Sequence, residues 1–201
     1  KSEMSMNKQF VLAPQPTLKR IADLDGPDFY PTPAWATHAL IENESFRGDI
    51  WECACGNGAM SRVLEKTENR VISSDLYDRG YGEVGVDFVR SDRRVDNIVT
   101  NPPFNAAEEF VHCGLRAATR KFSLLLRLAF LEGARRQHGI FNVNAPARVW
   151  VFSERITFYP EGAEKKGSGT TAYAWFVWDR EYSGPTELKW LPTGYKTRYA
   201  S

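Results

Sequence analysis

Short apolar runs alternate with amphipathic stretches through the middle of this 201-residue chain. The apolar runs predict strands at 49–54, 70–75, 84–86, 96–100 and 122–128, and the amphipathic stretches predict helices at 33–43, 59–67 and 106–119. Strands that alternate with helices in this order are typical of a parallel sheet with crossover helices. We therefore expect an α/β fold.

The two ends of the chain do not continue this alternation of strands and helices. Residues 148–158 and 171–179 are rich in aromatic and β-branched side chains, and they predict an antiparallel pair that closes the sheet. We expect the glycine-containing connection at 161–170 to be a mobile loop facing the substrate, with a plain hairpin connection as the alternative. Residues 1–27 are polar and irregular and predict a flexible or simply disordered arm, so that 28–201 form a single domain.

The segment IWECACGNG at residues 50–58 predicts a strand that runs into a glycine turn. Gly56 and Gly58 allow positive φ angles and let a ligand lie against bare backbone. The next strand ends at Asp75, about twenty residues further on, where a Rossmann-like unit places its ribose-binding carboxylate. Ser61 stands where the third glycine of a dinucleotide fingerprint would be, which favours a nucleoside ligand over a dinucleotide.

Asn101, Pro102, Pro103 and Phe104 follow a predicted strand directly, at the edge where open α/β sheets bind ligands. The two prolines have no N–H to donate, so the carbonyl groups there can only accept hydrogen bonds. The Asn101 side-chain oxygen is another acceptor, and Phe104 offers a flat surface for stacking. The four residues predict a site for a planar amine, although an ordinary turn at the end of a strand would also use asparagine and proline.

In these motifs and their order the chain resembles the class I S-adenosylmethionine-dependent methyltransferases. Within that class it is similar to the adenine-N6 amino-methyltransferases, including small DNA methyltransferases of bacteriophage and prophage. The resemblance covers residues 28–180 and includes the segments 124–133 and 171–178. It implies a Rossmann-like fold with a mostly parallel seven-stranded sheet, an antiparallel C-terminal hairpin and helices on both faces. It also implies S-adenosylmethionine as cofactor and no metal.

The resemblance implies roles for individual residues. Asn101, Pro102, Pro103 and Phe104 would be catalytic. The implied cofactor-binding residues are Tyr30, Thr32, Pro33, Glu52, Cys53, Ala54, Gly56, Asn57, Gly58, Asp75, Leu76, Asp87, Phe88 and Asn101. Among these, Asp75 would hold the ribose, Asp87 the adenine amine and Phe88 the adenine face, while residues 28–33 would close over the methionine end. Phe104, Asn105, Arg127, Lys165 and Lys166 are expected to contact the acceptor.

The expected acceptor is adenine in DNA, with short or relaxed sequence specificity, because only residues 179–201 follow Trp178 in place of a separate recognition domain. Three alternatives remain open. An RNA adenine methyltransferase would use the same four catalytic residues. A protein glutamine also presents a planar amine, although such enzymes more often have tyrosine where Phe104 stands. The third is a non-catalytic cofactor-binding scaffold that works through a partner, against which the intact Asn101 and Asp75 argue.

Charge and composition give little further evidence about function. The net charge of +1 gives no strong reason for nucleic-acid binding, so a local basic face would have to supply it. The candidates for such a face are Arg127, Arg135, Arg136, Lys165 and Lys166. Three cysteines and three scattered histidines predict neither a disulfide framework nor a zinc site, and two of them, Cys53 and Cys55, are expected to line the cofactor loop.

The sequence has no apolar segment long enough to span a bilayer and no signal-peptide pattern, which predicts a cytoplasmic protein without membrane contact. Thr32 is expected to cap the first helix, with Pro33 in its first turn. A homodimer or a partner protein is a possible source of a recognition surface.

Overall fold

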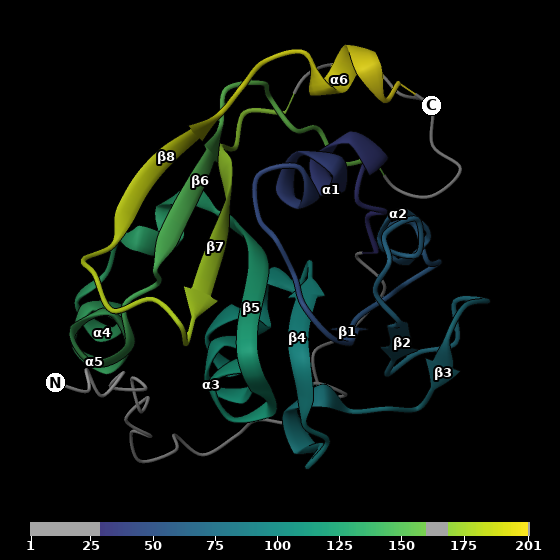
Figure 1. The fold of residues 1–201 in the computed structure, drawn as a ribbon, viewed down its shortest axis with the longest axis horizontal. Coiled ribbons are helices and arrows are strands. Elements are labelled where there is room, and N and C mark those ends of the chain that lie inside the picture. The colour runs from purple at the N-terminus through teal and green to yellow at the C-terminus, as the bar shows by residue number, and fades with distance from the viewer. Residues whose placement is uncertain (1–28, 160–168, 201) are drawn as a thin grey trace, which may run out of the picture.

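The computed structural model describes residues 29–159 and 169–200. Within these ranges eight strands form one sheet, in the order β3-β2-β1-β4-β5-β7-β6-β8 (Figure 1). The strands are β1 (Ile50–Glu52), β2 (Val71–Asp75), β3 (Glu83–Val84), β4 (Val95–Thr100), β5 (Ala118–Arg127), β6 (Arg148–Phe152), β7 (Tyr173–Asp179) and β8 (Glu187–Leu191). The predicted arm at 1–27 and the two lysines of the 161–170 loop lie outside the described residues.

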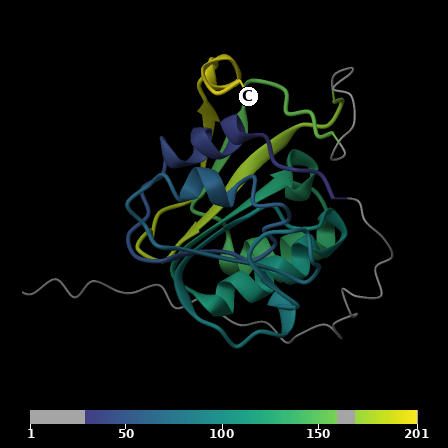
Figure 2. The ribbon, with the colours of Figure 1, turned by 90° about the vertical axis from the view of Figure 1, so that its right-hand side faces the viewer.

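Helices cover both faces of the sheet, as expected (Figure 2). One face carries α1 (Ala34–Ile41), α2 (Ser61–Leu64) and α6 (Tyr195–Arg198). The other face carries α3 (Ala107–Ala117) and the helical segment that runs through α4 (Ala134–Arg136), a π-helix (Gln137–Phe141) and α5 (Asn142–Asn144). Each helical layer packs on its own apolar cluster, because the strands of a covered sheet bury side chains on both faces.

The sheet confirms the predicted topology and adds one strand to it. Strands β3, β2, β1, β4 and β5 run parallel, and β7 pairs antiparallel with both β5 and β6. The expected count of seven strands is wrong, because β8 pairs in parallel with β6 and forms the eighth. Leu188 and Trp190 of β8 are exposed, so the apolar residues of this edge strand do not mark a buried face as they do in the central strands.

Two local expectations are corrected. The first helix begins at Ala34 with Pro33 in the N-cap position, and no side chain caps it. Thr32 therefore does not cap the helix. The strand expected at 122–128 begins earlier, at Ala118, because α3 ends at Ala117 and the chain passes directly into β5.

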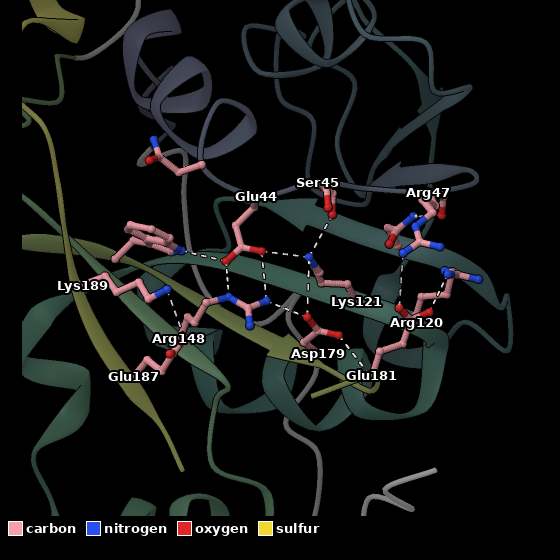
Figure 3. A pocket seen from close by; sticks show the side chains of 13 residues that line it. Glu44, Ser45, Arg47, Arg120, Lys121, Arg148, Asp179, Glu181, Glu187 and Lys189 are labelled. Carbon is pink, nitrogen blue, oxygen red and sulfur yellow. Dashed lines mark hydrogen bonds and ion pairs between the residues drawn. The ribbon is translucent and has the colours of Figure 1, made fainter. Parts of the chain in front are cut away.

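Helix α1 is anchored to the sheet near its start and beyond its end. Near its start the Trp175 indole donates to the Ala36 carbonyl over 2.9 Å. Beyond its end, Glu44 is buried and accepts hydrogen bonds from Lys121 at 2.8 Å, from Trp150 at 2.8 Å and from the Arg148 guanidinium (Figure 3). This cluster lies at the amino edge of β5 and β6, opposite the edge where Asn101 follows β4.

Candidate active site at the carboxyl edge of the sheet

A cavity of about 780 Å³ opens at the carboxyl edge of the parallel strands. It is lined by most of the residues that the sequence singled out: Tyr30, Thr32, Glu52, Cys53, Ala54, Asn57, Asp75, Leu76, Asp87, Phe88, Asn101, Pro102, Pro103, Phe104, Asn105 and Arg127. Pro33, Gly56 and Gly58 lie behind this lining, and Lys165 and Lys166 are outside the described residues. Parallel strands bring these segments together because their carboxyl ends meet at one edge.

Asn101 is held in one orientation. It follows the last residue of β4, and its amide nitrogen donates to the Thr32 hydroxyl over 3.1 Å. Its amide oxygen is buried and has no hydrogen-bond partner among the described residues. A buried acceptor left without a donor costs about 1–3 kcal/mol, so a ligand that offers an N–H group there would remove that cost.

Phe104 lies in a group of planar side chains. Its ring centroid is 5.6 Å from that of Tyr173 and 6.1 Å from that of Phe158, and the Arg127 guanidinium carbon lies 4.7 Å from the Phe104 centroid. Burial raises the pKa of the Tyr173 hydroxyl, while the charge of Arg127 and a hydrogen bond from it act in the opposite direction. The arrangement provides a flat apolar surface next to a cation.

The glycine loop is shaped by two aromatic rings. Gly56 and Gly58 have φ angles of +54° and +82°, which L side chains rarely adopt. A Cβ atom on Gly56 would lie 2.0 Å from the Phe29 ring, and one on Gly58 would lie 2.4 Å from the Tyr81 ring. The two rings therefore fill the Cβ side of the glycines, while Asn57 between them reaches the cavity.

Asp75 joins the end of β2 to the glycine loop. One carboxylate oxygen accepts from the Gly56 amide over 2.8 Å, and the other accepts from the Tyr77 amide over 2.9 Å. The carboxylate is buried and lines the cavity. Because each carboxylate oxygen has two acceptor positions, Asp75 can still receive donors from a ligand.

Glu52 is a second buried carboxyl group in this lining. Burial raises its pKa to about 8, and a hydrogen bond from the Ser61 hydroxyl offsets only part of that rise. Ser61 also lies 2.7 Å from the Ser73 hydroxyl. The residue that stands in place of a third glycine thus positions Glu52, a role that its sequence position alone did not indicate.

Asp87 and Phe88 have mainly structural contacts in the ligand-free protein. Asp87 caps a 3-10 turn by accepting from the Val89 amide over 3.0 Å, and it forms an ion pair with Arg90 at 3.5 Å. Phe88 packs edge-on against Trp51, with 5.2 Å between the ring centroids. Both residues nevertheless lie in the cavity lining, at the side next to β3.

Several lining residues were missed by the sequence reasoning. They include Arg79, Ile156, Thr157, Phe158 and Tyr173, whereas Phe29 and Cys55 belong to segments that were expected here. Those from 156–158 follow β6, which runs parallel to β5 because both pair antiparallel with β7. Only the strand order reveals that the segment after β6 returns to this edge.

The predicted basic face does not form as a group. Arg127 lines the cavity, but Arg135 and Arg136 do not. They pair instead with Glu108, at 2.9 Å and 3.2 Å, because α3 and α4 lie on the same face of the sheet. Guanidinium groups near this edge that form no ion pair with a described carboxylate include those of Arg79, Arg127 and Arg155.

Within residues 29–159 and 169–200, His, Cys, Asp and Glu side chains form no group of three or more that could hold a metal ion. All three cysteines are buried and free, and Cys53 and Cys55 lie in the cavity lining. No helix in the described part of the chain combines the length and apolar character needed to cross a membrane.

The fold resembles solved structures of methyltransferases. The modification subunit of a predicted type I restriction enzyme from Vibrio vulnificus aligns with 83% of this chain, at a TM-score of 0.56 and 16% identity, and the chain spans 48% of that subunit. A predicted RNA methyltransferase from Pyrococcus horikoshii aligns with 76% of this chain and 86% of its own, at a TM-score of 0.55 and 14% identity.

A dimethyladenosine transferase from Plasmodium falciparum aligns with 76% of this chain and 62% of its own, at a TM-score of 0.54 and 15% identity. No protein-family model matches the sequence, and the comparison with curated proteins found no match. At these identities the likeness concerns the fold. The chain therefore has the Rossmann-like methyltransferase fold.

Proposed function

We propose that this protein transfers a methyl group from S-adenosylmethionine to the exocyclic N6 amine of adenine in DNA, with short or relaxed sequence specificity. One observation carries the proposal. Thr32 engages the amide nitrogen of Asn101, while the amide oxygen is buried and lacks a partner among the described residues. An adenine amine in the cavity would supply the missing donor, and the rigid Pro102 carbonyl would accept its second N–H bond.

This arrangement would act mainly by positioning. The lone pair of adenine's exocyclic nitrogen is delocalised into the ring, so the free amine is a poor nucleophile. Acceptance of its two N–H bonds by Asn101 and Pro102 would favour a pyramidal nitrogen with its lone pair outside the ring plane. S-adenosylmethionine, when bound, supplies a methyl group activated by a sulfonium. The amine gains that methyl group and releases one proton, without a covalent enzyme intermediate.

The lining of the cavity fits the cofactor. Its volume of about 780 Å³ lies within the range of roughly 300–1,000 Å³ that is usual for small-molecule sites. Asp75 offers a buried carboxylate with free acceptor positions for ribose hydroxyl groups. Apolar side chains of Leu76, Val86 and Phe88 line the same part of the cavity and suit a purine ring.

The charges at the cavity edge support a nucleic-acid acceptor. Arg79 and Arg127 line the cavity, Arg155 follows β6, and none of the three forms an ion pair with a described carboxylate. Cations that are free of carboxylates can neutralise backbone phosphates. The similar restriction-enzyme modification subunit favours DNA, whereas the similar predicted RNA methyltransferase makes adenine in RNA the second candidate.

The acceptor can be identified with tritiated S-adenosylmethionine. Purified protein would be incubated with DNA and RNA oligonucleotides of matched sequence, in single-stranded and duplex forms, and with a glutamine-containing peptide. We expect label in DNA and N6-methyladenine as the modified nucleoside. Label in RNA alone would establish the second candidate, and label in the peptide alone would point to a protein acceptor. Cofactor binding without any labelled acceptor would favour a scaffold.

Two variants separate the roles within the site. Asn101→Ala should abolish transfer and leave cofactor affinity largely intact, because it removes the buried, unpartnered oxygen that we assign to the acceptor amine. Asp75→Ala should weaken cofactor binding measured by calorimetry by about 10- to 100-fold, since hydrogen bonds to a charged group contribute about 1.5–3 kcal/mol. Asn142→Ala is the matched control, because that exposed side chain bonds only to Gln137 among the described residues. Full transfer activity in Asn101→Ala would refute the assigned role.

A further inference from the structure

Strand β5 carries two cations on one face, and their environments differ. Lys121 and Arg127 are six residues apart in an unbroken register with β7, so their side chains lie on the same face. Lys121 pairs with Glu44 at 2.8 Å and with Asp179 at 3.7 Å at the amino edge (Figure 3). Arg127 is exposed at the carboxyl edge and forms no ion pair with a described carboxylate.

The Arg127 guanidinium lies over the ring of Phe104, 4.7 Å from its centroid. Tyr173 and Phe158 contact the same ring from other directions, and the ring also packs against the apolar cluster beneath α1. The guanidinium therefore covers one face of the Phe104 ring, and both residues line the cavity. Because a guanidinium and a nucleobase are both planar, they compete for that surface.

We propose that Arg127 occupies the stacking surface of Phe104 in the free protein and exchanges it for a backbone phosphate of the acceptor nucleotide when the base enters. This inference rests on the proposed nucleic-acid acceptor. Arg127 would give up a cation–π contact, which is weak at an exposed site, and its hydrogen bond to the Tyr173 hydroxyl, whereas an arginine–phosphate pair is charge-assisted and bidentate. Arg127 would thus be a positioning residue that couples the entry of the base to a contact with its strand.

Salt dependence of binding tests the phosphate contact. Fluorescent single-stranded oligonucleotides containing one adenine would be titrated with wild-type protein, Arg127→Gln and the control Arg70→Gln between low and moderate salt. Arg70 is paired with Asp49 at the amino edge and carries the same charge. Loss of one phosphate contact should reduce the slope of log affinity against log salt by about 0.7 in Arg127→Gln. The slope of Arg70→Gln should match that of the wild type.

A second measurement changes the nucleic acid and compares its effect on the wild type and on Arg127→Gln. One phosphate next to the target adenosine would be replaced by an uncharged methylphosphonate, in separate DNA and RNA versions of the oligonucleotide. We expect the wild type to lose affinity for one of the two flanking substitutions by about tenfold, as for the loss of a charge-assisted hydrogen bond. Arg127→Gln should show no further loss from the same substitution.

The outcomes distinguish the two proposals. Transfer to the oligonucleotide with an unchanged salt slope in Arg127→Gln and equal sensitivity to methylphosphonate in both proteins would overturn the role of Arg127 alone. Failure of the wild type to bind or methylate any oligonucleotide would overturn the proposed function together with this inference. A reduced slope in Arg70→Gln would show that total charge, rather than Arg127, determines the effect, and would also overturn the inference.

Discussion

Thr32 and Asn101 are 69 positions apart in the chain, yet their side chains meet over a 3.1 Å hydrogen bond. The bond determines which end of the Asn101 amide is an acceptor toward the cavity, because its nitrogen is already engaged. It also ties the segment before α1 to the end of β4. The catalytic turn and the segment expected to close over the cofactor therefore meet at this contact.

Thr32→Val should slow methyl transfer by about fivefold, which corresponds to the loss of one hydrogen bond that contributes about 1 kcal/mol and orients the amide. Thr32→Ser retains the hydroxyl group and should keep most of the activity. Single-turnover rates at saturating cofactor measure the effect on the transfer step. A rate for Thr32→Val equal to that of the wild type would show that other contacts orient Asn101.

Gly56→Ala should destabilise the fold more than Gly80→Ala. Both glycines have positive φ, and such a conformation costs an alanine about 1–2 kcal/mol. A Cβ on Gly80 would meet nothing within 4 Å, whereas one on Gly56 would collide with Phe29, and such overpacking adds about 1–3 kcal/mol. Urea unfolding measures the free energy of unfolding of the two variants. Phe29→Ala in the Gly56→Ala background should recover the second contribution, and no recovery would argue against the collision.

The free energy of unfolding should fall as the pH rises from about 4.5 to 8, because of the buried Glu52 carboxyl group. Burial raises the pKa of this carboxyl group to about 8 in the folded protein, above its ordinary value of 4.5. The folded state therefore binds a proton more tightly, and the stabilisation is complete below pH 4.5 and lost as the pH rises toward 8. Glu52→Gln should lack this decline in the free energy of unfolding. Parallel pH profiles for the two proteins would contradict the assignment.

Glu44 should give the opposite dependence in a lower pH range. Burial acts to raise its pKa, but hydrogen bonds from Arg148, Lys121 and Trp150 outweigh burial and hold the pKa below 4.5. The stabilisation is therefore present above about pH 4.5 and is lost as the pH falls through the folded pKa.

Glu44→Gln should cost up to about 3–5 kcal/mol at neutral pH, because it removes the buried counter-charge of Lys121 and Arg148 and leaves them only the less buried Asp179. The matched control is Glu181→Gln, whose exposed pair with Arg120 should contribute about 0–1 kcal/mol. Guanidinium chloride screens charges, so urea is the denaturant to use. Equal losses in the two variants would show that burial does not strengthen the Glu44 cluster.

The sequence predicted the order of strands and helices well, because the periodicity of apolar residues reflects which side chains are buried. The strand at 70–75 was placed within one residue of β2 (Val71–Asp75). The edge strand β8 was missed, since half of its side chains face solvent and its partner β6 lies about forty residues earlier in the chain. Strand pairing at such separation depends on the packed sheet and leaves no local pattern.

By itself the sequence determined the α/β class, the Asn101 to Phe104 turn, the glycine loop and Asp75, since each depends on local backbone preferences and on its position after a strand. Only the tertiary structure decided the contacts that orient these groups. Thr32 meets Asn101, Phe29 covers Gly56, and Tyr173 and Phe158 surround Phe104. Each of these contacts joins distant segments, and its geometry depends on how α1, β6 and β7 pack against the sheet.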